Sequence, residues 1–262
     1  MIHRIASGIT VWMLALSAFA LDVSEYQLVD LSHSYNEDTL YWPTSPTKFE
    51  KTVLAFGETA NGGFYSAFSI STPEHGGTHL DAPLHFAADG LATDQIPLQN
   101  LIGNAVVIDI SKQAESNRNY LLSVNDIRSF EDQYGRINAG DIVLLRTDWS
   151  KFWPDAMRYL GDDTPGDDSH LQFPSYGEDA ARLLVEKRKV AVLGVDTAST
   201  DFGKSKDFVV HRIAAARNVS NLENLTNLDK LPPTGAVVFA LPMKIEGGSG
   251  GPVRVVALVP NR

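Results

Sequence analysis

Three of the seven histidines and one aspartate lie within eleven residues, in the stretch EHGGTHLDAPLHF at positions 74–86. His75, His79 and Asp81 are two imidazoles and a carboxylate, which together suit zinc, manganese or iron with coordination positions left open for water. The chain has no cysteine, so a metal site must use nitrogen and oxygen ligands. This stretch therefore predicts a metal or catalytic site.

The spacing within this stretch decides whether its side chains can meet. The four candidate residues, His85 included, stand at odd positions, and on an extended chain such side chains share one face. On a helix His75 and His79 would also meet, at i and i+4, but Gly76, Gly77 and Pro83 disfavour a helix here. The alternative is a set of unrelated packing histidines. The clustering around two glycines favours a cation site.

A second segment, DFVVHRIAAARNVSNLENLTNLDKLP (207–232), places His211 and Glu223 in an otherwise apolar and amide-rich stretch. Leucines at 222, 225 and 228 surround the glutamate, which could otherwise be a solvated surface acid. A buried carboxylate needs a partner. We therefore expect Glu223 to be paired or to hold a cation.

These residues carry a resemblance to a known family. HGGTHLDAPLHF resembles the H-x-G-T-H-x-D-x-P-x-H-F signature of the cyclase family, which includes bacterial kynurenine formamidase and isatin hydrolase. The similarity covers most of the chain after residue 20. It includes VDLSHSYNEDTLYWP (29–43), VLLRTDWSKFW (143–153), GVDTASTDF (194–202), VVHRIAAARNVSNLENLTNLDKLP (209–232) and LPMKIEGGSGGPVRVVAL (241–258).

The resemblance implies a role for each matching residue. His75, His79 and Asp81 would bind one metal ion, and His211 with Glu223 would hold a second that shares Asp81. Isatin hydrolase lacks the later glutamate and uses one manganese, so Glu223 favours two ions, zinc or manganese. The resemblance also implies a swivelling β/β/α domain and a homodimer.

The same resemblance gives His85 the role of catalytic acid/base. Imidazole titrates near neutral pH and can take a proton from water and deliver it to a leaving nitrogen. We expect hydrolysis of an aryl amide, with an N-formylkynurenine-type arylformamidase as the first candidate and isatin-type ring opening as the second. A non-catalytic binding protein and a polyketide-type cyclase or lyase remain alternatives, although a binding protein has no need of His85.

Aromatic residues near the signature are candidates for the substrate wall. Tyr41 and Trp42 precede Pro43 in a loop-like stretch, and Trp42 could stack on a flat aryl amide. Phe64 flanks the signature and is a third substrate-binding candidate. For Phe68 and Phe86 we expect ordinary core packing.

The elements that must position these residues read as mixed α/β. The helices expected are SVNDIRSFEDQYG (123–135), with Ser123 opening a capping box, Tyr176–Lys189, and a short one near Val210. The Gly-dense segment Gly247–Pro252 predicts a turn, a bulge or a close backbone approach to a ligand. Runs rich in Val and Ile predict strands at 27–31, 64–70, 105–110, 142–146, 190–195, 236–241 and 253–259.

Composition and the N-terminus limit the protein's partners and location. The net charge is −10 and no basic run is present, which excludes ordinary nucleic-acid binding. Residues 1–20 combine Arg4, an apolar run and Ala18-Phe19-Ala20, which predicts a secretory signal peptide cut after Ala20. Residues 21–262 are then expected to form one secreted hydrolase domain, extracellular or periplasmic, that contacts no membrane after cleavage.

Overall fold

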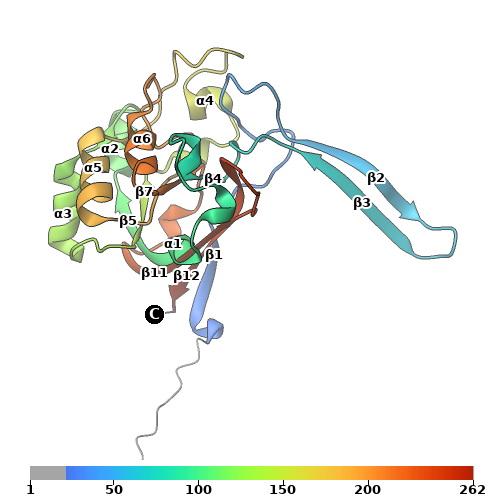
Figure 1. The fold of residues 1–262 in the computed structure, drawn as a ribbon, viewed down its shortest axis with the longest axis horizontal. Helices are drawn as coiled ribbons and strands as arrows, with labels where there is room; N and C mark the ends of the chain where they lie inside the picture. The colour runs from blue at the N-terminus through green and yellow to red at the C-terminus, as the bar shows by residue number, and fades with distance from the viewer. Residues whose placement is uncertain (1–21, 262) are drawn as a thin grey trace, which may run out of the picture.

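The computed structural model describes residues 22–261, and the predicted signal peptide lies outside them (Figure 1). Its main element is an eight-stranded sheet in the order β1-β12-β11-β5-β7-β9-β10-β4. The strands are β1 (Tyr26–Asp30), β4 (His79–Asp81), β5 (Ile102–Asp109), β7 (Ile142–Arg146), β9 (Val192–Val195), β10 (Ser220–Glu223), β11 (Thr234–Pro242) and β12 (Gly250–Pro260).

The sheet is mixed and closes on itself. β5, β7, β9 and β10 are successively parallel, whereas the remaining pairings are antiparallel. β4 pairs with β10 on one side and with the beginning of β12 on the other, which joins the last strand of the order to the second one. The mixed α/β fold predicted from the sequence is thus confirmed. The short strand that carries the signature motif is held between two segments distant in sequence.

Alternate residues of the strands fill two separate cores. Along β7, Ile142 and Leu144 belong to a cluster that draws side chains from all eight strands. Val143 and Leu145 belong to a second cluster with residues of the helices. Both faces of the central strands are therefore apolar, which explains their continuous Val- and Ile-rich sequences.

Helices pack against the outer face of the parallel strands (Figure 1). Ser123 caps α3 through its side chain and the capping box predicted from the sequence is present, with Gly135 at the C-terminal end. α5 continues without a break into a π-helical stretch, Leu183–Arg188. The helices are α1 (Leu98–Leu101), α2 (Ser111–Ser116), α3 (Val124–Tyr134), α4 (Ala156–Leu160), α5 (Glu178–Arg182) and α6 (Val209–Ala215). No helix between residues 22 and 261 has the length and apolar character needed to cross a membrane.

A long hairpin leaves the body of the molecule (Figure 1). Its strands, β2 (Glu50–Glu58) and β3 (Phe64–Ser71), pair only with each other among the described residues. β3 was expected from the sequence, but β2 was not. Two further short strands, β6 (Leu121–Leu122) and β8 (Ser175–Tyr176), form a small parallel pair.

Candidate metal centre

The two sequence segments that carry the predicted ligands lie side by side in the sheet. β4 and β10 are antiparallel neighbours, with Glu223 opposite His79. Leu80 and Leu222 point into the core shared by the strands, and each is fully buried. Because neighbouring side chains on a strand face opposite ways, His79, Asp81 and Glu223 must face the other side. Burial of each leucine stabilises this register by about 1.5–3 kcal/mol.

A tight turn brings His75 back toward this face. Gly76 has φ of 154°, and a Cβ there would overlap the Tyr41 ring, so only glycine fits. The Tyr35 hydroxyl lies 2.6 Å from the Gly76 carbonyl and 2.8 Å from the Thr78 carbonyl, which ties the turn down. The two glycines of the motif thus serve a close approach of backbone to aromatic rings.

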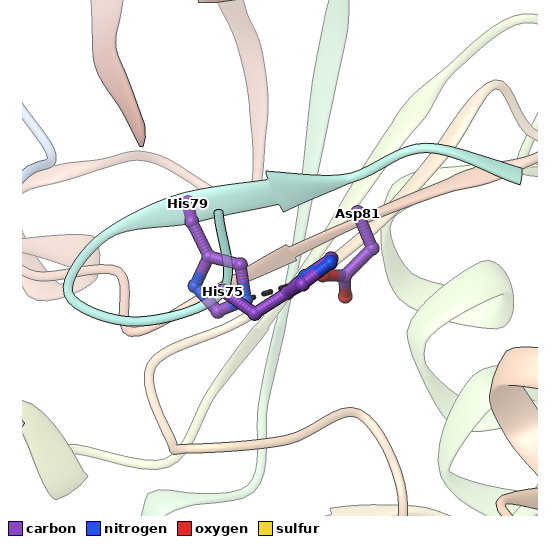
Figure 2. Close-up of side chains that lie close together, drawn as sticks. All are labelled: His75, His79 and Asp81. Carbon is purple, nitrogen blue, oxygen red and sulfur yellow. Dashed lines mark hydrogen bonds and ion pairs between the residues drawn. The ribbon is translucent and has the colours of Figure 1, made fainter. Parts of the chain in front are cut away.

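Two of the predicted ligands, His75 and His79, meet at one oxygen of a third, Asp81 (Figure 2). His75 Nδ1 is 2.6 Å from Asp81 Oδ1, and His79 Nε2 is 3.2 Å from the same atom. Candidate ligand atoms of these three residues all lie within 4.8 Å of one another. His79 and Asp81 are buried, whereas a quarter of the His75 side chain is exposed.

His211 lies at the second oxygen of Asp81 and brings Glu223 beside it. His211 Nε2 is 3.2 Å from Asp81 Oδ2 and 3.1 Å from Glu223 Oε1, and all three residues are buried. His79 Nε2 is also 3.6 Å from Glu223 Oε2. The structure thus brings together all five residues predicted as metal ligands, and Asp81 faces both groups.

Acceptors fix the outer nitrogens of two of these imidazoles. His211 Nδ1 is 2.6 Å from Asp201 Oδ2, and His79 Nδ1 is 3.0 Å from the Gly77 carbonyl. The backbone N–H of Thr200 donates to Glu223 Oε1 at 2.8 Å. Such partners orient imidazole and carboxylate ligands of metals. Asp201 and Thr200 lie in the GVDTASTDF segment, where the sequence alone assigns them no role, because only the fold places them against α6 and β10.

The buried carboxylates dominate the electrostatics of the cluster. Burial alone would lower the pKa of His79, but Asp81 and Glu223 outweigh it and raise the pKa to about 9. The pKa of His211 is likewise raised well above its usual value by Asp201, Asp81 and Glu223, against the effect of burial. For Asp81, burial opposes ionisation, but His79, His211 and His75 hold its pKa well below the usual range. The site therefore demands positive charge, which protons or a cation can supply.

The donor set fits a divalent cation. Three imidazoles and two carboxylates converge from β4, β10, α6 and the turn at His75, a nitrogen and oxygen set typical of zinc and manganese. Two buried side-chain oxygens beside the cluster, Thr200 Oγ1 and Asn221 Oδ1, have no hydrogen-bond partner within residues 22–261. Thr200 and Asn221 neighbour Glu223 and Asp81 in the fold, so water around a cation could satisfy them.

The cluster forms the floor of a cavity of about 370 Å³. Trp42, Phe86 and Phe208 line it together with Tyr41 and His85. Trp42 packs at a tilt on Phe208, with ring centroids 6.1 Å apart, and Phe208 in turn lies 5.3 Å from Phe86. Tyr41 and Trp42, the candidates for the substrate wall, thus line this cavity. Phe208 was missed, and Phe86 lines the cavity rather than the core.

Phe64 does not belong to this cavity, which corrects its assignment as a substrate-binding residue within one chain. It lies at the end of the hairpin, with 60% of its surface exposed. Phe68 is also exposed rather than part of the core. The physical reason is that Phe64 begins β3 (Phe64–Ser71) in the protruding hairpin (Figure 1), so sequence proximity to His75 does not become proximity in space.

His85 lies at the edge of the cluster, at the end of a short 3₁₀ helix that begins at Pro83. Its ring stacks on His75 with centroids 3.8 Å apart and contacts Phe86 edge-on at 4.4 Å. Burial of the ring against its neighbours, together with the other histidines, lowers the pKa of His85 against the opposing effect of Asp81. The imidazole is therefore neutral at neutral pH, and one of its ring nitrogens carries a lone pair.

Comparison with known proteins agrees with this site. Residues 29–202 match the family described as "Putative cyclase". The chain belongs to the cyclase family. Isatin hydrolase from Roseibium aggregatum is 37% identical over 211 residues, which cover 77% of this chain and 78% of that protein. Kynurenine formamidase from Salinibacter ruber is 30% identical over 229 residues, 87% of this chain and 96% of that protein.

Solved structures extend the comparison to three dimensions. Isatin hydrolase A from Labrenzia aggregata, bound to benzyl benzoate, superposes with a TM-score of 0.83 at 33% identity. The superposition covers 91% of this chain and 95% of that one. The fold expected from the family resemblance is confirmed, and the protein is a hydrolase of the metal-dependent type.

Proposed function

We propose that this protein hydrolyses the carbon–nitrogen bond of a flat aryl amide with the help of bound divalent cations. The observation that carries the proposal is the convergence of four ligand-type side chains, three imidazoles and Glu223, around Asp81 at the floor of an aromatic-walled cavity. The relatives named above are hydrolases that act on such bonds.

Each part of the cavity has a task in this reaction. Trp42, Phe86 and Phe208 provide apolar surfaces that orient a planar ring and exclude water from it. A divalent cation held by the cluster supplies Lewis acidity, which polarises a carbonyl and acidifies water. A ring nitrogen of His85 takes the proton of the attacking water and later delivers it to the leaving nitrogen.

The cavity lining favours an uncharged cyclic aryl amide of the isatin type. Among the described residues that line it there is no lysine or arginine. N-formylkynurenine is a zwitterion, and its α-carboxylate would need a cationic partner when it leaves water. The greater identity to isatin hydrolase points the same way. The arylformamidase function favoured by the sequence motif therefore becomes the second candidate.

A direct assay tests the proposal. Purified protein, with zinc or manganese and after exhaustive chelation, is mixed with isatin, N-formylkynurenine and several lactones, and products are separated by chromatography. Isatin should open to its ring-opened acid only in the presence of metal. A metal-loaded protein that opens lactones or none of these compounds would contradict an amide hydrolase.

We further propose two cations per chain, zinc or manganese, which share Asp81. The support is that Oδ1 faces His75 and His79, whereas Oδ2 faces His211, with Glu223 completing the second group. Glu223→Gln should reduce metal content from two ions toward one, and Glu178→Gln, an exposed change on α5, should leave it at two. Wild-type protein that saturates at one ion would refute the shared-aspartate arrangement.

We propose export through the N-terminal segment, based on its signal-peptide pattern. The exported protein should begin at Leu21, and mass spectrometry of the secreted or periplasmic fraction tests this directly. Recovery of chains that still begin at Met1 would argue against cleavage.

We also propose a homodimer that is built through the β2–β3 hairpin. An isolated two-stranded hairpin has little stability in water. Yet this one exposes Val53, Leu54, Phe56, Phe64, Tyr65 and Ile70 on its two strands. Apolar surface on this scale marks an interaction site, and a symmetric second copy would cover both arms at once.

A further inference from the structure

The Gly-dense segment 247–252 lies directly against the metal cluster. β12 begins at Gly250, which is paired with Asp81, and Pro252 is paired with His79. The backbone N–H of Ala82 donates to the Ser249 carbonyl at 2.8 Å. The C-terminal turn therefore lies beside β4, on the edge opposite to the Glu223 strand β10.

One side chain of this turn reaches His75. Ser249 Oγ is 2.9 Å from His75 Nε2 and 2.5 Å from Glu74 Oε2. The backbone N–H of Ser249 also donates to Glu74 Oε2, at 3.0 Å. Glu74, Ser249 and His75 thus form a continuous carboxylate–hydroxyl–imidazole chain that ends at Asp81.

The chemistry of the donors gives this chain a direction. A carboxylate only accepts hydrogen bonds, so the single hydroxyl proton of Ser249 goes to Glu74. The Ser249 oxygen must then accept from His75, which places the proton on Nε2. In this tautomer Nδ1 carries the lone pair that would bind a cation beside Asp81 Oδ1, 2.6 Å away, whereas a direct hydrogen bond to Asp81 needs the proton on Nδ1.

His75 differs here from the other two imidazoles. His79 and His211 are deeply buried, bond their outer Nδ1 directly to a fixed acceptor and direct Nε2 at the cluster. His75 is more exposed, presents Nδ1 instead, and depends on a side chain 174 residues away to hold its orientation. Of the three imidazoles, His75 is thus the one whose tautomer depends most on a residue distant in the sequence.

The glycines of the segment make this contact possible. A Cβ on Gly250 would lie 2.6 Å from His75 Cε1 and 2.6 Å from the Leu80 carbonyl, so only glycine lets the turn come this close. The close backbone approach considered for this segment from the sequence is therefore an approach to a candidate metal ligand.

We propose that Glu74 and Ser249 are positioning residues that fix the tautomer and orientation of His75, and so set the cation affinity of the His75–His79–Asp81 group. The inference rests on the proposed metal dependence. It predicts that loss of the Glu74–Ser249–His75 hydrogen bonds weakens the binding of one cation. The affinity for the cation held by His211 and Glu223 should not change. Outer partners of metal-bound histidines typically change affinity 10–100-fold.

Direct metal titration tests the inference. Metal-free wild type, Ser249→Ala, Glu74→Gln and Ser249→Thr compete for zinc with a chromogenic chelator. Ser249→Ala and Glu74→Gln should lose about 10–100-fold in the affinity of one ion, and Ser249→Thr, which keeps the hydroxyl, should recover most of it.

The matched control is Thr93→Val. The Thr93 hydroxyl anchors the same turn through the Gly248 and Gly250 carbonyls, at 2.9 and 3.2 Å, without a hydrogen bond to His75. It should bind both ions with near wild-type affinity. An equal loss in Thr93→Val, or no recovery in Ser249→Thr, would mean that the segment acts only through turn stability.

A spectroscopic readout is independent of activity. In cobalt-loaded wild type, the His75 Nε2 proton should give a hyperfine-shifted NMR signal protected from exchange by Ser249. In Ser249→Ala it should exchange rapidly and broaden, and in Thr93→Val it should persist. An unchanged signal and unchanged affinity in Ser249→Ala would overturn the relay. Wild type that binds no cation would instead refute the proposed function itself.

Discussion

The rings of His85 and His75 are nearly parallel, with centroids 3.8 Å apart. Their surroundings differ, and we expect different roles for the two residues. His75 has one nitrogen against Asp81 and the other against Ser249. His85 is held by ring contacts with His75 and Phe86, at the edge of the cluster. Substitution at these two positions should therefore separate metal binding from proton transfer.

The first prediction compares the two histidines. His85→Ala should lower turnover by about 10²–10⁴-fold, the usual contribution of acid–base catalysis, while metal content stays unchanged. His75→Ala should lose bound metal. Elemental analysis beside turnover measures both. An empty site in His85→Ala would make His85 a ligand, and full turnover with metal retained would remove its proposed role.

Other residues of the site could not be predicted from the sequence. The signature places His75, His79 and Asp81 within seven positions, so the sequence alone predicts that they act together. Asp201, Glu74 and Ser249 have no such local pattern, since their contacts with His211 and His75 depend on folding. Common residue types that act on a ligand from a distant segment leave no signal in one sequence.

At the scale of elements, strong local patterns were the predictable ones. β7 matches its expected range of 142–146, and α3 begins at its predicted cap. β4 has three residues and exists because β10 and β12 flank it, so no periodicity could reveal it. β2 was missed because its apolar run, residues 53–56, has only four residues and lies between charged residues and a glycine, whereas the equally exposed β3 has a longer apolar and aromatic run.

Two loops meet over the cavity and supply the second prediction. Asp168, in the segment after α4, accepts from Trp42 Nε1 at 3.2 Å and pairs with Lys206 at 2.7 Å. Asp168→Ala removes the hydrogen bond that holds the Trp42 indole in the cavity wall. KM should rise about 2–10-fold, which corresponds to the free energy of one hydrogen bond, with little change in kcat or metal content. Steady-state kinetics with the best substrate of the panel measures this.

The control lies in the same loop. Asp163→Ala removes an exposed carboxylate for which the structure gives no contact with Trp42, and its KM should stay at the wild-type value. If Asp163→Ala and Asp168→Ala raise KM equally, the effect comes from the charge of the loop and not from the position of the indole.

At the scale of the whole molecule, one buried carboxyl makes stability depend on pH. Burial raises the pKa of Asp196 to about 7, although hydrogen bonds from the Thr147 backbone and hydroxyl oppose the shift. The folded protein thus holds this proton more tightly than the unfolded chain. Its contribution to stability is complete below about pH 4 and is lost as the pH rises toward 7.

The third prediction follows from that sign. Asp196→Asn keeps an oxygen for Thr147 but cannot ionise, so its unfolding free energy should rise relative to wild type between pH 4 and 7. The upper limit is about 4 kcal/mol, from a shift of about three pKa units. Urea titrations of chelator-treated proteins at several pH values measure the difference, with Asp163→Asn as control. A difference that does not vary with pH would show that Asp196 is ionised throughout.

The last prediction concerns the β2–β3 hairpin. Its phenylalanine side chains pack against one another although they face solvent. Phe56 lies 5.1 Å from Phe64, edge to face, and 6.2 Å from Phe68. Phe56 is 70% exposed in the single chain. Such exposure of a large apolar side chain is unfavourable in free energy, and an isolated pair of strands has little stability to offset it. If a second copy covers the arms, these phenylalanines are the residues on which its affinity depends.

Phe56→Ser should therefore raise the dimer dissociation constant at least tenfold, because truncating a central aromatic of an interface costs about 2 kcal/mol or more. Met157→Ser changes an exposed apolar residue of α4 on the body and should leave the dimer intact. Sedimentation velocity over a range of micromolar concentrations distinguishes the outcomes. A wild type that stays monomeric, or a dimer that tolerates Phe56→Ser, would mean that the arm meets a different partner.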